Sequence, residues 1–176
     1  MSNNPQIKEA NSADVAILCK LGEQTFIETY GHQNTPENLQ AYLSKHFSQE
    51  QLLSEIQTEG TIFLMVELNE EIVGYAKLRV NKAEFSDRNA LELERIYVKK
   101  EFHGKKLGAY LLEQCIEKTK AVGCDLLWLG VWEYNLKALN FYKSWGFEIS
   151  GTHIFVLGDD EQTDYLMTKE IDILKV

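Results

Sequence analysis

The sequence predicts one α/β domain, of the α+β kind, built on a central twisted sheet. Three observations support this prediction. Apolar residues recur at helical spacing in the first third of the chain, two segments alternate as β-hairpins, and a strand–helix–strand order lies between them. The hairpins predict a mostly antiparallel sheet, and the strand–helix–strand order adds one parallel pair. We therefore expect a mixed sheet flanked by about four helices, in a single domain that covers residues 1–176.

The first third is predicted to be helical after one short strand. Gln6–Ala10 is the strand candidate, and Ser12 is the expected cap of the first helix. Thr35, which is followed by proline, is a cap for the second helix. Ser48 with Gln51 three residues later is typical of a capping box, so a third helical segment is expected there.

Two hairpins are predicted in the rest of the chain. Thr61–Leu68 and Glu71–Asn81 form the first, joined by a tight polar turn. Phe147–Leu157 and Tyr165–Ile171 form the second, and we expect Gly158–Asp164 to be an acidic loop between them.

The strand predicted at Leu91–Val98 has an unusual alternation. Apolar residues fall at 91 and 93 and then at 96 and 98, so the phase slips by one residue. A β-bulge produces such a slip and commonly re-aims side chains beside active sites. The alternative is two adjacent charges on an exposed edge strand, and the pattern favours the bulge.

A helix and a buried strand complete the strand–helix–strand unit. The stripe that begins at Leu107 predicts a helix ended by Gly123, and Asp125–Trp132 is a near-continuous apolar strand. Asn135–Trp145 is predicted to be a further helix, ended by Gly146.

Composition limits the class of protein. The net charge of −9 argues against a nucleic-acid partner, whose backbone requires a positive surface, and it is compatible with a cationic small molecule. No apolar run approaches membrane-spanning length and no secretory leader is evident, so we expect a cytoplasmic protein without a membrane partner. Cys19, Cys115 and Cys124 lie far apart, which favours buried reduced thiols over a metal site.

The segment His103–Gly108 is a candidate anion site. It lies between a strand and an amphipathic helix, where free backbone N–H groups and the helix dipole favour an anion. Its two glycines permit close backbone approach, and its two lysines add positive charge. By itself the segment is equally compatible with a solvated basic corner.

Two further features belong with this turn. A bulge that splays Leu91–Val98 from Asp125–Trp132 leaves backbone groups that an extended ligand with amide groups is able to satisfy. Tyr142 lies on the helix after the second strand, where a phenol is able to protonate a leaving group. The alternative for Tyr142 and its neighbour Phe141 is packing as core aromatics.

Taken together, these segments resemble the GCN5-related N-acetyltransferase (GNAT) superfamily over essentially the whole chain. The signature N-x-x-A-x-x-F-Y-x-x-x-G-F is intact between Asn135 and Phe147. The family's turn is commonly [QR]-x-x-G-x-[GA], and this chain has His103, Lys106 and Gly108 at those positions, so two of the three depart from it. NTPENLQAYL, LELERIYV, WLGVWEYN and GDDEQTDYLM further resemble the PaiA-type polyamine acetyltransferases.

The resemblance implies the GNAT fold and an acetyl-CoA-dependent N-acetyltransferase, with no metal, that acts on a primary amine of spermidine or spermine. Other amines are the nearest alternative: an amino acid, an aminoglycoside or a protein N-terminus. A CoA-binding regulatory protein without turnover is the alternative from another class. A homodimer is a family-level expectation.

The resemblance also implies roles for individual residues. Tyr142 is the expected acid for the CoA thiolate, and Glu92, then Glu94, is the expected base, acting through water. The alternative for either glutamate is an ordinary ion pair with Arg95 or a lysine. The remaining candidates follow from family position: for the cofactor Ile96, Tyr97, Val98, His103, Gly104, Lys105, Lys106, Leu107, Gly108, Ala109, Asn135, Tyr142 and Lys143, and for the acceptor Tyr30, His32, Asp159, Asp160 and Glu161.

Overall fold

The computed structural model describes residues 4–173. The chain divides into two compact units, each described by itself below. Unit 1 comprises Met1–Leu78 and Arg95–Cys115, and unit 2 comprises Arg79–Glu94 and Ile116–Val176. The expectation of a single domain over residues 1–176 stays a prediction.

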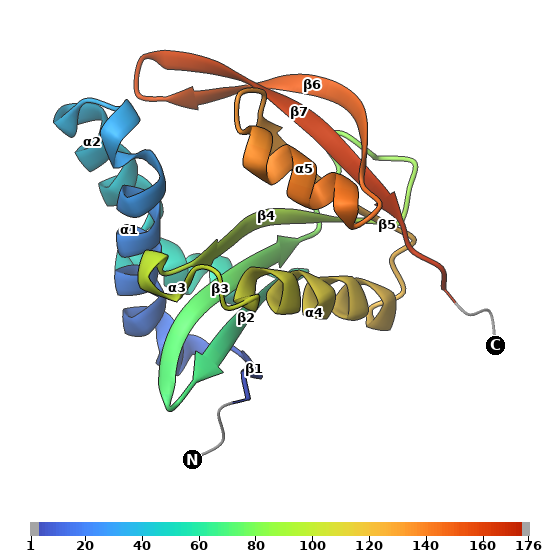
Figure 1. The fold of residues 1–176 in the computed structure, drawn as a ribbon, viewed down its shortest axis with the longest axis horizontal. Helices are drawn as coiled ribbons and strands as arrows, with labels where there is room; N and C mark the ends of the chain where they lie inside the picture. The colour runs from blue at the N-terminus through green and yellow to red at the C-terminus, as the bar shows by residue number, and fades with distance from the viewer. Residues whose placement is uncertain (1–3, 174–176) are drawn as a thin grey trace. The chain divides into compact units, whose positions relative to one another are not determined.

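The described residues form seven strands and five α-helices, at the places that the sequence predicts (Figure 1). The strands are β1 Gln6–Glu9, β2 Thr61–Leu68, β3 Glu71–Arg79, β4 Ala90–Val98, β5 Leu126–Trp132, β6 Glu148–Leu157 and β7 Asp160–Glu170. The helices are α1 Val15–Tyr30, α2 Pro36–His46, α3 Gln49–Gln57, α4 Leu107–Ala121 and α5 Leu136–Ser144. Short 3₁₀ turns occupy η1 Ser12–Asp14, η2 Gly31–Gln33 and η3 Lys100–Phe102.

The sheet is mixed, as the sequence predicts. Its strand order is β1-β2-β3-β4-β5-β7-β6. The pairs β1–β2, β5–β7 and β6–β7 are antiparallel, whereas β4 and β5 are parallel. A parallel pair requires a crossover, and α4 provides it between β4 and β5.

The first helix of unit 1 is capped one residue earlier than predicted. The Asn11 side chain accepts a hydrogen bond from the Ala13 N–H, and the Asp14 carboxylate accepts one from the Asn11 N–H. This reciprocal capping box opens a 3₁₀ turn that leads into α1. The expected cap, Ser12, is therefore the first residue of that turn.

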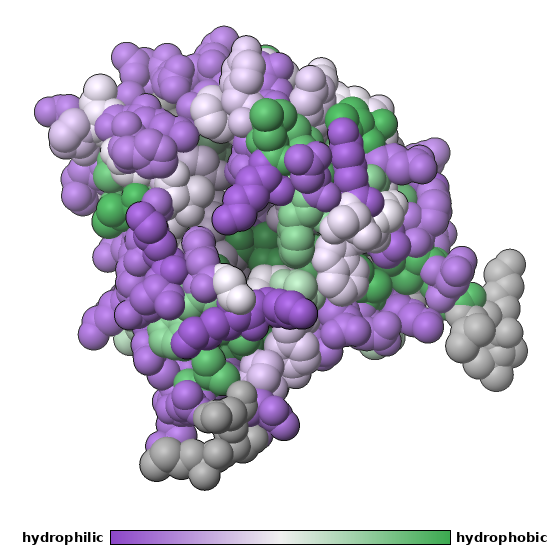
Figure 2. Space-filling view, in the orientation of Figure 1, coloured by the Kyte–Doolittle hydropathy of each residue, from purple (hydrophilic) through white to green (hydrophobic). Residues whose placement is uncertain are grey.

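Close packing holds the helices of unit 1 together. Figure 1 shows α1, α2 and α3 gathered in one part of this unit. Phe26 of α1 stacks on Tyr42 of α2 at 4.4 Å between ring centroids. A Cβ atom on Gly22 would lie 2.4 Å from the Phe47 ring, so only glycine allows this approach. The surface over α2 in Figure 2 is mainly hydrophilic, as expected for a helix with one buried residue, Leu43.

A charged network joins α3 to the strands of unit 1. Arg95 makes a bidentate pair with Glu55 at 2.9 and 3.1 Å, and Lys77 approaches the same carboxylate at 2.9 Å. All three side chains are at most 10% exposed. Burial raises the pKa of Glu55, but the Arg95 guanidinium and the other donors outweigh it and bring the pKa to about 2. Arg95 thus forms its bidentate ion pair with Glu55.

The final hairpin of unit 2 is longer than predicted. β6 and β7 pair from Glu148 opposite Thr168 to Leu157 opposite Asp160, so the expected acidic loop 158–164 is mostly strand. Only Gly158, with φ +65°, and Asp159 form the turn. Polar residues on this part of the hairpin lack an alternating apolar pattern, which is why the sequence indicated a loop.

Candidate functional site

The turn before α4 belongs to unit 1 and has the shape of an anion site. The first N–H groups of an α-helix have no intrahelical acceptor, and here they belong to Leu107, Gly108 and Ala109. A Cβ atom on Gly104 or on Gly108 would meet nothing within 4 Å, so the backbone is open to a ligand. Leu107 is 3% exposed and anchors the start of the helix in the core.

Lys106 adopts the conformation that usually belongs to glycine. Its φ is +60°, in the left-handed region, although it is not glycine. This is the position at which the turn departs from the common glycine pattern, so the chain reaches the same backbone shape at a cost of about 1–2 kcal/mol. Its neighbour Lys105 is directed elsewhere, because its Nζ lies 5.0 Å from the centre of the Phe102 ring. The expected departure from the family pattern therefore has a conformational cost but preserves the turn.

The end of β4 lies beside this turn within unit 1. His103 donates from Nε2 to the Val98 carbonyl at 2.8 Å, which ties the turn to the strand. The ring of Tyr97 belongs to a cluster of tyrosines, with the Tyr75 ring centroid 6.1 Å away. Burial, followed by the nearby Tyr30 and Tyr75, raises the pKa of Tyr97 well above its ordinary value. Of the predicted cofactor residues, Ile96, Tyr97 and Val98 are half-buried.

In unit 2, Glu92 and Glu94 both form ion pairs with the guanidinium of Arg79. The Glu92 Oε2 accepts from Arg79 Nε at 2.6 Å and from Asn81 Nδ2 at 2.8 Å, and Arg79 Nη1 lies 3.3 Å from Glu94 Oε1. The ion-pair alternative is therefore realised with Arg79. Within residues 4–173 no hydrogen bond to Glu92 Oε1 is found, so this oxygen is open to a water or an amine. The predicted bulge near Glu94 stays a prediction.

The parallel ladder in unit 2 is short. It covers Ala90–Glu92 opposite Leu126–Trp128, and β5 then continues from Leu129 to Trp132 against β7. Within unit 2, this second half of β5 therefore keeps one edge without a paired strand among the described residues. Such an edge has N–H and C=O groups available to an extended ligand with amides.

Asn135 has a local structural role. Its Oδ1 accepts from the Ala138 N–H at 3.1 Å and caps α5, which gives the asparagine of the signature a local structural reason. Lys143, on the same helix, is exposed.

Tyr142 is fixed by the end of α5. The Phe147 N–H donates to the Tyr142 carbonyl and the Gly146 N–H to the Lys143 carbonyl, a Schellman motif with Gly146 at φ +85°. The hydrophobic contact that accompanies this motif is the edge-on pair of Tyr142 and Phe147, 5.6 Å between centroids. Tyr142 is 8% exposed, so the residue has a packing role as well as its predicted chemical one.

The predicted acceptor residues fall in both units. In unit 1, Tyr30 ends α1 and packs on Phe26 at 4.7 Å, and His32 is exposed in η2. In unit 2, Asp159 lies in the turn of the hairpin, and Asp160 and Glu161 are exposed at the start of β7.

Sequence reasoning missed His153 and Trp128 in unit 2 and gave Asp164 only as the last residue of the acidic loop. His153 and Asp164 face each other across β6 and β7, and Asp164 is 9% exposed. Trp128 is buried, and among the described residues its Nε1 has no hydrogen-bond partner. The available signal was Gly130, because an isolated glycine inside an apolar strand often marks a place where a ligand comes close.

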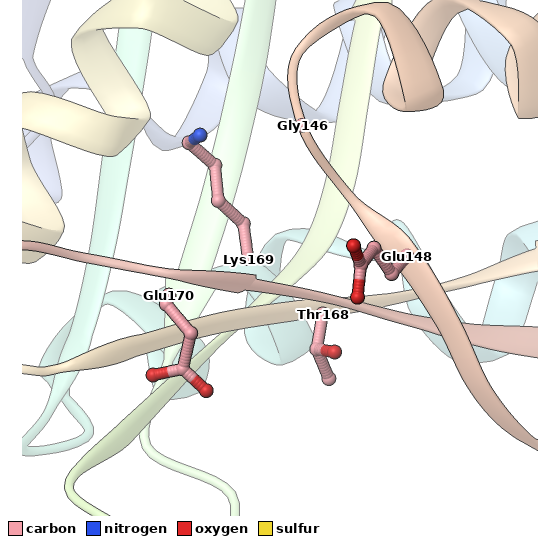
Figure 3. A pocket seen from close by; sticks show the side chains of 5 residues that line it. All are labelled: Gly146, Glu148, Thr168, Lys169 and Glu170. Atoms are coloured by element: carbon pink, nitrogen blue, oxygen red, sulfur yellow. The ribbon is translucent and has the colours of Figure 1, made fainter.

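A separate pocket of about 260 Å³ lies on unit 2 (Figure 3). Its lining residues are Gly146, Glu148, Thr168, Lys169 and Glu170. None of the predicted site residues lines it, and its walls are polar, unlike most small-molecule sites. We do not assign the chemistry to this pocket.

The chain belongs to the acetyltransferase (GNAT) family, whose model matches residues 23–147. It is 40% identical to an uncharacterized N-acetyltransferase in the pepI 3′ region of Lactobacillus delbrueckii subsp. lactis, over 94% of this chain and 97% of that one. It is 25% identical to the spermidine N(1)-acetyltransferase of Thermoplasma acidophilum, over 95% and 98% of the two chains.

A solved structure has a similar fold. The PaiA N-acetyltransferase of Thermoplasma acidophilum, in complex with coenzyme A, matches with a TM-score of 0.79 at 24% identity, over 95% of this chain and 99% of that one. The protein is therefore an N-acetyltransferase with acetyl-CoA as its cosubstrate.

Two kinds of feature are absent from the described residues. No helix in residues 4–173 is long and apolar enough to cross a membrane. In the same range no three or more His, Cys, Asp or Glu side chains are grouped to hold a metal ion. Cys19, Cys115 and Cys124 are buried thiols outside any disulfide, as predicted, and burial raises the pKa of each thiol.

Proposed function

We propose that this N-acetyltransferase transfers the acetyl group to a primary amine of a polyamine such as spermidine. The observation that carries the proposal is the full-length similarity to a spermidine N(1)-acetyltransferase. The net charge of −9 supports it, because an acidic protein attracts a polycation.

Acetyl-CoA supplies the acetyl group as a thioester, and the chain's residues bind it and move protons. We assign the diphosphate to the N–H groups of the turn from His103 to Ala109, which its glycines leave open. We assign the amide-containing arm to the uncovered edge of β5 from Leu129 to Trp132.

Glu92 is the proposed base. Arg79 and Asn81 hold one of its oxygens, so Oε1 has a defined direction and accepts the proton from the amine through a water. The deprotonated amine forms the new C–N bond as the C–S bond breaks. Tyr142 donates its phenolic proton to the sulfur, and its position is set by the motif that ends α5.

An amine panel tests the proposal. Release of CoA thiol from acetyl-CoA is measured with spermidine, spermine, glycine, an aminoglycoside and a peptide. We expect the highest kcat/KM with spermidine or spermine. Preference for glycine or the peptide contradicts the polyamine assignment, and tight CoA binding without thiol release from any amine contradicts turnover.

A further inference from the structure

Gly130 is an exposed point in the middle of a buried strand. Leu129 and Val131 on either side are 2% and 7% exposed, whereas Gly130 is exposed. It lies in β5, whose apolar side chains otherwise fill the core of unit 2. The missing side chain therefore leaves a small space above the strand that is open to solvent.

Two acceptor atoms border this space. The position that a Cβ atom on Gly130 would occupy is 3.0 Å from His153 Cε1, 3.3 Å from Asp164 Oδ2 and 3.7 Å from His153 Nδ1, so both side chains lie directly over this glycine. The register explains the convergence, because Asp164 is opposite both His153 on β6 and Trp132 on β5, and Trp132 shares its face of the strand with Gly130. Residues of β5, β6 and β7 therefore meet at one point.

No hydrogen bond reaches either acceptor among residues 4–173. His153 Nδ1 is buried without a hydrogen bond, and no hydrogen bond or ion pair reaches the Asp164 carboxylate. Burial raises the pKa of Asp164, and the nearby His153 lowers it. A buried carboxylate without a donor costs free energy that a cation with N–H groups recovers.

This space lies on the same face of the sheet as Glu92. Glu92 is opposite Trp128 in the parallel ladder, and Trp128, Gly130 and Trp132 alternate along β5. Asp164 lies opposite Trp132, which is four residues beyond Trp128, or about 13 Å along the strand. A short monoamine does not span that distance, whereas a long diamine does.

We propose that Gly130, His153 and Asp164 form a subsite that binds a second, non-reacting ammonium group of the acceptor. The inference rests on the proposed function and adds to it the residues that distinguish polyamines from monoamines. Asp164 supplies the countercharge, and His153 Nδ1 accepts an N–H in the tautomer that carries its proton on Nε2. Gly130 has no side chain, so the ammonium group is able to approach the strand at this position.

The test is calorimetric binding of spermidine to protein saturated with CoA, which requires no turnover. Asp164→Asn keeps the shape and removes the charge, and we expect it to weaken spermidine binding about tenfold or more. Gly130→Ala places a methyl group 3.0 Å from His153 Cε1 and 3.3 Å from Asp164 Oδ2, so it shifts both side chains and is expected to weaken binding similarly. CoA affinity and the melting temperature check that both variants are folded.

Asp172→Asn is the matched control, because it removes one exposed carboxylate from the same unit, and its spermidine affinity is expected to equal that of the unmodified protein. A twofold or smaller effect of Asp164→Asn, or no spermidine binding by the unmodified protein, overturns the subsite. The proposed function fails separately. If spermidine binds through Asp164 but is not acetylated, the subsite stands and the acetyl-transfer assignment to polyamines falls.

Discussion

Arg79 Nε lies 2.6 Å from Glu92 Oε2, and this contact sets the geometry of the proposed base. The two residues are 13 positions apart in the chain, and Asn81 donates to the same oxygen. Oε2 therefore accepts both hydrogen bonds, and these bonds fix the orientation of the other carboxylate oxygen, Oε1. A base that acts through water benefits from such a fixed orientation.

Glu92→Gln tests this role. We expect kcat to fall about a hundredfold, because a positioned base typically contributes factors of that order, while the KM for acetyl-CoA stays the same. Glu94→Gln is the control, since Glu94 shares Arg79 but is the second choice as base. Equal losses of kcat in the two variants would mean that activity depends on the ion-pair network around Arg79 and not on Glu92 as a base.

Tyr142→Phe separates chemistry from packing. Phenylalanine keeps the edge-on contact with Phe147, so the melting temperature should stay within the error of measurement. We expect turnover to fall at least about tenfold, with little change in CoA affinity, because only the proton donor is lost. Tyr142→Ala removes the ring as well and should cost about 3–5 kcal/mol of unfolding free energy. Parallel losses of turnover and CoA affinity in Tyr142→Phe would indicate a structural role alone.

The left-handed conformation of Lys106 makes a prediction about stability. Lys106→Gly relieves the strain, and we expect the free energy of unfolding to rise by up to about 1 kcal/mol in urea titrations. Lys106→Ala removes the same charge but keeps the strain, so it should not stabilise. Both variants should bind CoA more weakly and with less dependence on salt, since a lysine next to a phosphate contributes a screened attraction. Unchanged salt dependence would remove Lys106 from the phosphate site.

Glu55 predicts how stability depends on pH. Its pKa is about 2 in the folded protein against 4.5 for the ordinary side chain, so the folded state binds the proton less readily than the unfolded state. The stabilisation is therefore fully present above about pH 4.5 and is lost as pH falls toward 2. Urea unfolding between pH 2 and 7 measures it. Glu55→Gln should flatten this part of the profile.

Glu55→Gln should also lower the free energy of unfolding at neutral pH. Glu55→Gln leaves Arg95 and Lys77 without their carboxylate, and breaking a buried pair typically costs about 3–5 kcal/mol. Glu50→Gln, on an exposed position of the same helix, is the control and should change little. A pH profile that keeps its slope in Glu55→Gln would assign the acid sensitivity to other groups.

Much of the fold was predictable because it depends on local spacing. Thr35 and Ser48 cap their helices as expected, and Gly123 and Gly146 end theirs with positive φ. The cap at Asn11 was missed because a 3₁₀ turn precedes α1, and β7 was predicted too short because its first residues are polar. These errors fall where the hydrogen bonds do not follow an apolar period.

The candidate site was predictable only in part. The turn at His103–Gly108 and the signature from Asn135 to Phe147 are continuous in sequence, so their chemistry is visible in the chain itself. The partners of the glutamates were not, and Arg95 pairs with Glu55 instead. His153 gave no signal, and Asp164 was indicated only as the last residue of the acidic run that begins at Gly158.

The sequence by itself determined the family signature, the helix caps and the parallel strand–helix–strand unit, since each depends on residues a few positions apart. The tertiary structure decided that Arg79 holds Glu92 and that Asp164 and His153 meet above Gly130. Strand register brings these residues together across long stretches of chain. Register follows from the packing of the whole sheet, so no local pattern specifies it.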